Sequence, residues 1–130
     1  MNVRLATKDD ADAIWEFWQN QKDPFRCAPL RKPIGRDELD RWLDGAWSVA
    51  LVEDEGRIIL TESFSIETGE SHLTNVSMEN FYRAIPVALA WEKELTGIPS
   101  WGRCGYVPVA ELYYTVGYVE AGDGVLRWVG

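Results

Sequence analysis

The sequence predicts an α+β fold, with a mixed, mostly antiparallel and twisted sheet flanked by helices, formed by residues 1–130 as a single domain. Three observations support this prediction. The 130 residues match the size of one ordinary domain and contain no repeat, low-complexity tract or linker. Apolar residues recur at helical spacing in some segments and in short strand-like runs in others. Hairpin-like turns precede a strand–helix–strand pattern, which indicates a mixed sheet with helices on its faces.

The first half of the chain reads as a strand, two helices and a hairpin. Residues 3–7, VRLAT, form a short strand, and Thr7 can cap the helix that follows it. The segment 21–35 contains three prolines and a glycine, which predicts a loop. A second, short helix spans 36–45. Residues 46–66 hold two apolar runs joined by the polar sequence EDEG, which predicts a hairpin.

The second half alternates strands and helices. Residues 71–77, SHLTNVS, follow a turn as a further strand, and residues 100–106 form another short strand. Residues 108–118 read as a helix that ends at Gly117, and a last pair of strands surrounds the turn AGDG. The predicted order is therefore β-α-α-β-β-β-α-β-α-β, with a final extension.

The segment 77–97, SMENFYRAIPVALAWEKELTG, combines a helical pattern with an internal proline. A proline in a helix interior costs about 3 kcal/mol, so two interpretations compete. A helix can run from Met78 to Thr96 with a kink, or it can begin at Pro86, whose fixed φ suits a first turn. We favour the second, which leaves 77–85 as a connection. The apolar face of that shorter helix would be Val87, Ala88, Trp91 and Leu95, with Glu92, Lys93 and Glu94 outside.

The chain is acidic, with a net charge of −8, and from Asp37 onward it has sixteen acids and six bases. Such a surface repels nucleic acid, so we expect no nucleic-acid partner. It would suit a cationic acceptor such as an amine, although an acidic surface more commonly only confers solubility. The longest apolar run, 84–91, is too short to cross a bilayer, and the first ten residues lack the core of a signal peptide. We therefore expect no membrane partner and a cytoplasmic location.

Two cysteines and one histidine provide few metal ligands, so we predict no metal site. We expect Cys27 and Cys104 to be reduced thiols in the core. The segment 22–36 holds five of the thirteen basic residues. It either binds an anionic group or partner, or is a loop whose bases offset nearby acids, and we favour the second interpretation. The seven tryptophans fit the apolar faces of predicted elements, which favours core packing over ligand stacking.

Two motifs and the order of elements resemble the GNAT superfamily of acyl-CoA-dependent N-acyltransferases. The sequence VRLATKDDADAIWEFW, residues 3–18, is similar to the opening strand and helix of that family. The sequence ELYYTVGYVEAG, residues 111–122, is similar to its late helix, which often reads L-Y-x-x-x-G-F-x-x-x-G. The resemblance covers nearly the whole chain. It implies a GNAT-like fold, acetyl-CoA as the cofactor, and an acceptor that is a primary amine on a small molecule or protein.

The resemblance also implies where the cofactor binds. In that family the fourth strand pairs with the pantetheine arm, and the connection to the third helix holds the pyrophosphate. Two of that connection's glycine positions fall on Ala84 and Pro86, and Phe81 and Tyr82 add bulk beside them. The cofactor-binding residues carried over are Asn75, Val76, Ser77 and Arg83.

The same resemblance implies the catalytic groups. Tyr113 matches the tyrosine that often protonates the leaving thiolate, and the alternative is a tyrosine packed on the sheet. Glu62 is our candidate for the base that takes a proton from the acceptor ammonium. Glu67 and His72 are further candidates. Strand-edge glutamates are mostly solvated, and a lone histidine beside a turn is mostly a surface residue. For each of these three side chains, such a surface role is the alternative to catalysis.

Three hypotheses follow. The first is a small N-acetyltransferase. The second is a catalytically inactive GNAT-like binding or structural protein that has lost acyl-CoA binding and acts through a protein partner. Virus-encoded proteins with degenerate GNAT-like sequences are an analogy for it. The third is an unrelated α+β ligand-binding domain, which two fully paired central strands, without the V-shaped splay of the family, would support.

Overall fold

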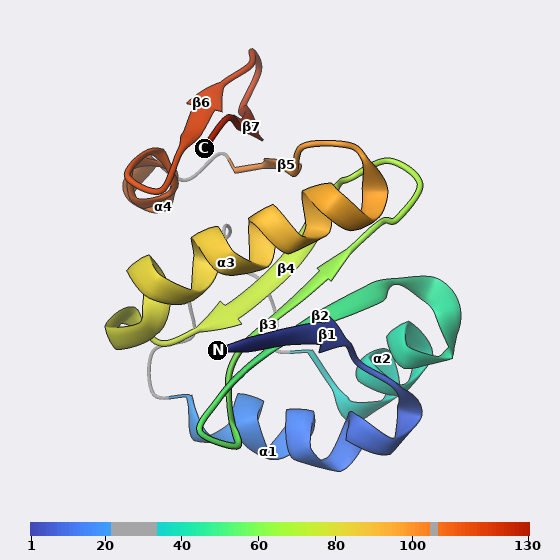
Figure 1. Cartoon of the computed structure of the whole chain (residues 1–130). Helices are drawn as coiled ribbons and strands as arrows, with labels where there is room; N and C mark the ends of the chain where they lie inside the picture. The colour runs from blue at the N-terminus through green and yellow to red at the C-terminus, as the bar shows by residue number, and fades with distance from the viewer. Residues whose placement is uncertain (22–33, 105–106) are drawn as a thin grey trace.

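A computed structural model describes residues 1–21, 34–104 and 107–130 (Figure 1). Four strands form an antiparallel sheet in the order β1 (Asn2–Leu5), β2 (Ser48–Asp54), β3 (Arg57–Phe64) and β4 (Ser71–Val76). A second sheet has the order β5 (Trp101–Arg103), β7 (Val125–Trp128) and β6 (Tyr118–Glu120). The helical elements are η1 (Lys8–Asp10), α1 (Ala11–Asn20), α2 (Arg36–Arg41), the π-helical turn η2 (Trp42–Ala46), α3 (Met78–Thr96) and α4 (Val107–Tyr114). The predicted α+β class and order of elements are confirmed.

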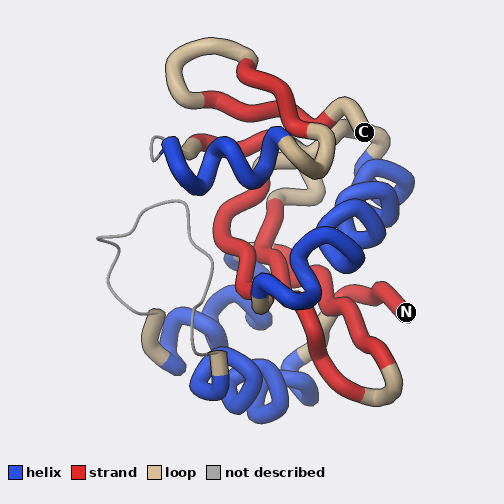
Figure 2. Tube along the Cα trace, turned by 90° about the vertical axis from the view of Figure 1, so that its left-hand side faces the viewer, coloured by secondary structure: helices blue, strands red, loops and turns tan. Residues whose placement is uncertain are grey.

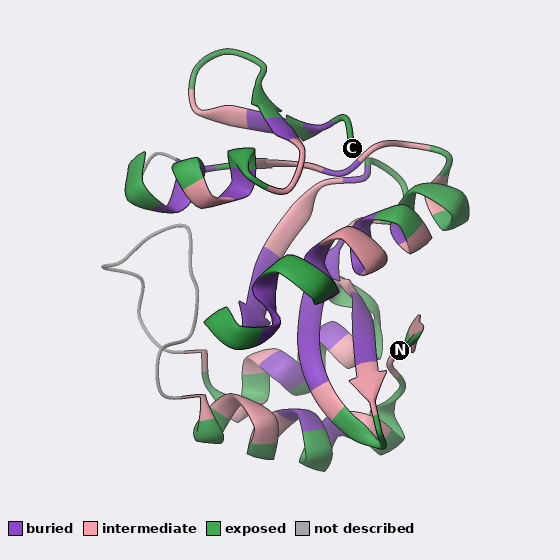
Figure 3. Ribbon diagram, turned by 60° about the vertical axis from the view of Figure 1, so that its left-hand side comes forward, coloured by how far each residue is buried: buried purple, intermediate pink, exposed green. Residues whose placement is uncertain are grey.

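The helices cover both faces of the first sheet (Figure 1). On one face α1, α2 and η2 bury a cluster made of Ile14, Leu39, Trp42, Val49, Leu51 and Leu73. On the other face α3 lies across the sheet and buries a larger cluster that includes Val52, Leu60, Val76, Phe81, Ala88 and Leu89. Figure 3 shows central strands buried over much of their length and helices that mix buried, intermediate and exposed residues. The second sheet and α4 lie together at one end of the molecule (Figure 2).

The predicted hairpin is present between β2 and β3. Its turn residues, Glu55 and Gly56, both have positive φ, 52° and 76°, as two-residue hairpin turns of the I′ kind require. Thr7 is the N-cap of η1, the turn that leads into α1, and its backbone N–H donates in return to the carboxylate of Asp10 at 2.8 Å. The predicted α3 stop is found at Gly97, which has a left-handed φ of 73°.

The structure contradicts our interpretation of Pro86. The helix does not begin there but runs without interruption from Met78 to Thr96, with Ser77 as its N-cap. The missing N–H of Pro86 leaves the carbonyl of Tyr82 without its helical donor. Tyr82 is 56% exposed, so the deficit falls on the solvent side of α3, where water can supply the donor. The proline is therefore tolerated inside the helix.

The earlier start also changes which face of α3 is buried. The buried residues follow helical spacing without a break: Phe81, Ala84, Ile85, Ala88, Leu89 and Glu92. Of the face that we predicted, only Ala88 is buried, and Leu95 is 44% exposed. Glu92, which we placed outside, is 2% exposed.

Replacing Pro86 tests this account. We expect Pro86→Ala to raise the free energy of unfolding by about 1–3 kcal/mol, since alanine restores the bond to the Tyr82 carbonyl, partly offset by greater freedom of the unfolded chain. Pro108→Ala is the matched control, because Pro108 lies in the first turn of α4, where no donor is needed. Urea unfolding measures both, and equal effects of the two variants would contradict the account.

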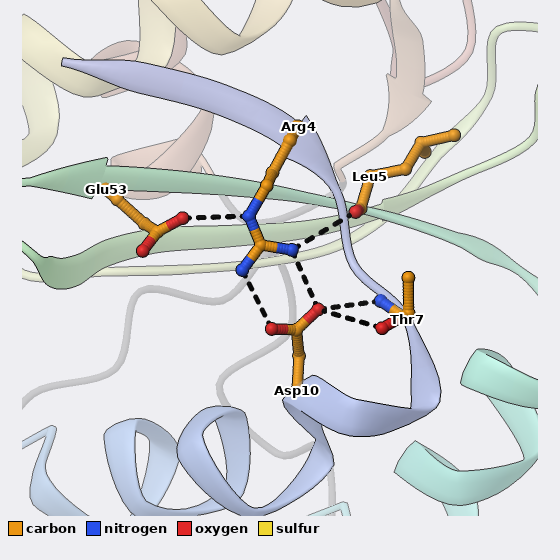
Figure 4. A network of polar contacts seen from close by, with 5 residues as sticks. All are labelled: Arg4, Leu5, Thr7, Asp10 and Glu53. Carbon is orange, nitrogen blue, oxygen red and sulfur yellow. Dashed lines mark hydrogen bonds and ion pairs between the residues drawn. The ribbon is translucent and has the colours of Figure 1, made fainter.

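A polar network joins the N-terminal strand to the first helix and to the hairpin (Figure 4). The two terminal nitrogens of the Arg4 guanidinium donate to both carboxylate oxygens of Asp10, each at 2.8 Å. Its Nε donates to Glu53 on β2 at 2.9 Å. Arg4 holds the pKa of Asp10 at about 2, below the ordinary 3.8, and the N–H of Thr7 adds to that shift. The network thus fixes where η1 and α1 leave the sheet.

Asp10→Asn should destabilise the fold by about 2 kcal/mol at neutral pH. A carboxylate with a lowered pKa contributes stability above its unfolded value of 3.8 and loses it as the pH falls toward 2. The difference between wild type and variant should therefore vanish near pH 2. Asp12→Asn is the control. Asp12 forms an ion pair with Arg36, but its side chain is 93% exposed, so its replacement should change stability little. A pH-independent difference for Asp10→Asn would refute this origin.

Some expectations fall on residues 22–33 and 105–106, which lie outside the described residues. They include Cys27 and most of the basic segment 22–36. Its last member, Arg36, forms ion pairs with Asp12 and Asp40. Within the three described ranges, no helix is both long and apolar enough to pass through a bilayer.

Candidate functional site

A cleft opens between β4 and β5, the neighbouring edges of the two sheets. The two edges are joined by one parallel bridge, Glu70 to Trp101. The turn before β4 closes this end, because the indole of Trp101 donates to the carbonyl of Thr68 at 2.8 Å. Gly69 in that turn has a φ of 77°, and a Cβ there would lie 2.9 Å from the side chain of Ile98. Beyond the bridge, β4 and β5 belong to different sheets and share no further strand pairing among the described residues.

The walls of the cleft come from both sheets and from α4. It is lined by Ser71, His72, Leu73, Thr74, Gly102, Arg103, Cys104, Tyr113, Tyr118 and Leu126. In the described part of the chain, β4 pairs along its length with β3 alone, so its other edge presents backbone groups to the cleft. The free space is small, about 40 Å³. A ligand larger than a few water molecules requires the strands to part further.

Glu62 lies directly behind this wall. Against our expectation of a solvated strand-edge residue, it is 2% exposed, because its side chain points from β3 toward α3. Its Oε2 accepts hydrogen bonds from the hydroxyls of Ser71 and, at 3.4 Å, Thr74. Both hydroxyl residues line the cleft. The carboxylate is therefore one hydroxyl away from any molecule that the cleft admits.

A bulge in β4 produces this convergence on Glu62. Phe64 pairs with Ser71 and Ser63 pairs with Leu73, so His72 is an extra residue in the ladder. In a regular strand, residues three apart point to opposite faces. The extra residue brings Ser71 and Thr74 to the same face.

A second buried carboxyl group faces Glu62. Glu92 of α3 lies within hydrogen-bond reach of it, and burial together with the charge of Glu62 raises the pKa of Glu92 well above its ordinary value. No other hydrogen-bond partner is found, among the described residues, for Glu62 Oε1 or for either oxygen of Glu92. Our sequence analysis missed Glu92. The signal was its place, three residues after Leu89, on the stripe that begins at Phe81.

Two tyrosines complete the polar interior. Tyr118 shares a hydrogen bond of 2.9 Å with the buried hydroxyl of Ser100. Burial, followed by the charge of Glu62, raises the pKa of Tyr118 well above 10.0, so its phenol stays protonated. Tyr113 of α4 packs against Tyr118 with ring centroids 5.2 Å apart. The site thus combines a buried acid pair, two bridging hydroxyls and two phenols.

Solved structures of acetyltransferases have a similar architecture. The ribosomal-protein-alanine N-acetyltransferase of Brucella melitensis superposes with a TM-score of 0.62 at 17% identity, over 98% of this chain and 96% of that one. The GNAT domain of S. lividans PAT has a TM-score of 0.64 at 18% identity, over 96% and 86%. Spermidine N-acetyltransferase SpeG of Vibrio cholerae, as its F149A mutant, has a TM-score of 0.60 at 18% identity, over 98% and 92%. No protein-family model matches the sequence, and no curated protein matches it significantly.

This chain has the GNAT acetyltransferase fold. The limited pairing between β4 and β5 agrees with that assignment and counts against an unrelated domain with fully paired central strands.

Within the GNAT fold, the residues that we predicted to bind the cofactor have different surroundings. Val76 is fully buried beneath α3, and Asn75 is 2% exposed on the neighbouring position of β4, so only their backbone can serve the cleft edge. Ser77 caps α3 and accepts a hydrogen bond from the Asn80 side chain at 3.0 Å. Arg83 forms an ion pair with Asp54 at 2.7 Å, so its positive charge is already balanced by a carboxylate.

The first turns of α3 replace a glycine-rich connection. Phe81 is buried against Tyr113, with ring centroids 5.8 Å apart, and Tyr82 packs edge-on against Phe81. The first turn exposes Met78 and carries the acidic Glu79. A helix N-terminus attracts anions, and Glu79 opposes that attraction here.

The other base candidates lie apart from the acid pair. Glu67 is exposed, as predicted, in the turn before β4. His72 stacks on Trp47 with ring centroids 4.3 Å apart and meets Trp42 edge-on. It is therefore a half-buried member of an aromatic cluster, which also includes Trp15 and Trp18, rather than a surface residue. Among the residues that the structure describes, no group of three acidic, histidine or cysteine side chains could hold a metal ion.

Tyr118→Phe should lower the free energy of unfolding by about 1 kcal/mol, because the Ser100 hydroxyl, 1% exposed, loses its partner. Tyr114→Phe, at a position 41% exposed, is the matched control and should leave stability unchanged. Thermal unfolding of both variants measures the difference, and equal stabilities would contradict a buried hydroxyl pair.

Proposed function

We propose that this chain is an N-acyltransferase that transfers an acetyl group from acetyl-CoA to a primary amine. The observation that carries the proposal is the arrangement at the cleft. An open backbone edge of β4 borders it, the Glu62 carboxylate lies one hydroxyl behind it, and Tyr113 forms part of its wall. These are an acceptor of protons and a donor of protons on two sides of one narrow space.

The residues present fit the acyl-carrying arm of acetyl-CoA once the cleft widens. The amide-rich arm can pair with the β4 edge beside Asn75 and Val76 as an added strand would. Beyond that edge, the N-terminus of α3 at Met78 would offer amide groups to the pyrophosphate, against the opposing charge of Glu79. When bound, acetyl-CoA supplies the activated thioester.

The chain's own residues then divide the proton transfers. Glu62 accepts the proton that the acceptor ammonium must lose before its nitrogen can attack. Tyr113 holds a phenolic proton on the opposite wall, where it can be given to the departing thiol. Leu73, Cys104 and Leu126 add apolar atoms to the lining, and an apolar lining strengthens electrostatic interactions within it.

The acceptor class follows from charge. A chain with net charge −8 attracts cationic molecules over distance, and a primary ammonium is such a molecule. The similar structures include enzymes named for the alanine of a ribosomal protein and for spermidine. Both names point to primary amines, on a protein and on a small molecule, and both are candidate acceptors for this chain.

A second function, a GNAT-fold protein that binds a protein partner without acyl-CoA, is favoured by a different observation. The first turns of α3 are closed by side chains: Phe81 packs on Tyr113, Asn80 bonds Ser77, and Arg83 is held by Asp54. The cleft itself is narrow. These contacts would have to yield before a large cofactor could bind.

Acetyl-CoA titration separates the two functions. We expect heat of binding and a rise in melting temperature at millimolar acetyl-CoA, and release of thiol when spermidine or an alanine-initiated peptide is added. Glu62→Gln and Tyr113→Phe should each reduce kcat about 10²- to 10⁴-fold. Tyr114→Phe, exposed on α4, is the control that should retain activity. Absence of heat, thermal shift and thiol release would leave the partner-binding function as the better account.

A further inference from the structure

The buried carboxyl pair cannot be two ionised groups. Two carboxylates provide acceptors and no donor, yet Glu62 Oε1 and both oxygens of Glu92 lack any other partner in the described ranges. Adjacent like charges in a buried site also repel strongly. One proton between the two groups supplies the missing donor and leaves a single negative charge. The remaining acceptor, Glu62 Oε2, already receives the hydroxyls of Ser71 and Thr74.

We infer that Glu62 and Glu92 share one proton and act together as the proton acceptor of the cleft, with Ser71 passing the proton to them. This inference rests on the proposed function. Glu92 does not line the cleft and touches no reacting atom, so it is a positioning residue. Ser71 lines the cleft and bonds the pair, so it is the group that meets the acceptor.

The transfer balances without another reactant. The N–H bond of the acceptor ammonium breaks, its electron pair stays on nitrogen, and the proton joins Ser71 Oγ. In the same step the original hydroxyl proton of Ser71 moves to Glu62 Oε2. The pair changes from one proton to two and from one negative charge to none. Because a buried charge is costly, this uptake relieves the unfavourable burial of the negative charge. After the product leaves, transfer of the extra proton through Ser71 to a water molecule restores the pair to one proton.

The remaining titratable groups near the pair do not compete for this proton. Among the described residues, Tyr118 of β6 faces the pair, since the charges of Glu62 and Glu92 both raise its pKa, and Tyr113 of α4 packs on Tyr118. The hydroxyl of Tyr118 is bonded to Ser100 and its phenol stays protonated at neutral pH. Lys93 and Glu94, the charged neighbours of Glu92 on α3, lie on the exposed side of the helix.

The first arm of the test needs no activity. A carboxyl group protonated in the folded chain and ionised in the unfolded chain makes stability fall as the pH rises above 4.5. The unfolding equilibrium constant of wild type should therefore gain a factor of up to about ten per pH unit there. Glu92→Gln, which keeps a hydrogen-bond donor, should lose that slope, and Glu94→Gln, exposed on the same helix, should keep it. The infrared band of a protonated carboxyl at neutral pH should likewise disappear in Glu92→Gln alone.

The second arm measures transfer from acetyl-CoA to spermidine. Ser71→Ala should reduce kcat about 10²-fold or more with KM for acetyl-CoA unchanged, and Ser71→Thr should restore most of the rate. Glu92→Gln should also reduce kcat with KM for acetyl-CoA unchanged, because an amide donor replaces the carboxyl donor that bonds the Glu62 carboxylate. Unchanged kcat in Ser71→Ala would overturn the relay. Equal pH slopes and equal infrared bands in wild type and Glu92→Gln would overturn the shared proton.

The two arms keep the inference and the proposed function apart. If wild type transfers no acetyl group to spermidine or to an alanine-initiated peptide, the proposed function fails and the relay fails with it. The first arm still decides whether the pair shares a proton. If wild type is active but Ser71→Ala is fully active too, the function stands and the relay falls.

Discussion

The site depends on the single bridge between Glu70 and Trp101. Among the described residues, this bridge is the only strand pairing between the two sheets, so β4 and β5 are not held together beyond it. Every feature of the site follows from this lack of pairing. The edge of β4 is left without a strand, Ser71 and Thr74 have a space in front of them, and α4 can bring Tyr113 to the opposite wall. If β4 and β5 were hydrogen-bonded along their whole length, Glu62 and Glu92 would lie behind a continuous sheet.

The position of α3 is the second determinant of the site. This helix is unusual because it packs a carboxyl group, that of Glu92, against the sheet. A helix that crosses a sheet normally presents an apolar stripe to it. Here the stripe ends in Glu92, opposite a glutamate of β3, so two groups that water would solvate are held in the interior. Such groups are retained at a cost in stability. The proton sharing that we infer would account for that cost, because it would connect the packing of α3 to chemistry in the cleft beside β4.

Much of this fold could be predicted from the sequence because its signals are local. Two apolar runs indicated β2 and β3, the sequence EDEG indicated their turn, and Thr7 and Gly97 marked helix ends. The error at Pro86 has a physical cause, since propensity describes an isolated helix, and it does not include water on an exposed carbonyl or burial along a whole face. Starting the helix eight residues late shifted its inward side, and Glu92 was then placed in solvent. The burial of Glu62 also lay beyond local reasoning, because it depends on the packing of α3, whose Glu92 is thirty residues later in the chain.

The bulge at His72 shows how strand length can specify a chemical arrangement. Two hydroxyls an odd number of positions apart converge on one oxygen only because an additional residue reverses the phase of the strand between them. Deleting that residue would leave every polar group of the sequence in place and still point one hydroxyl at the aromatic cluster on the far side. The arrangement of the site therefore depends on the number of residues between its polar groups as well as on their identities.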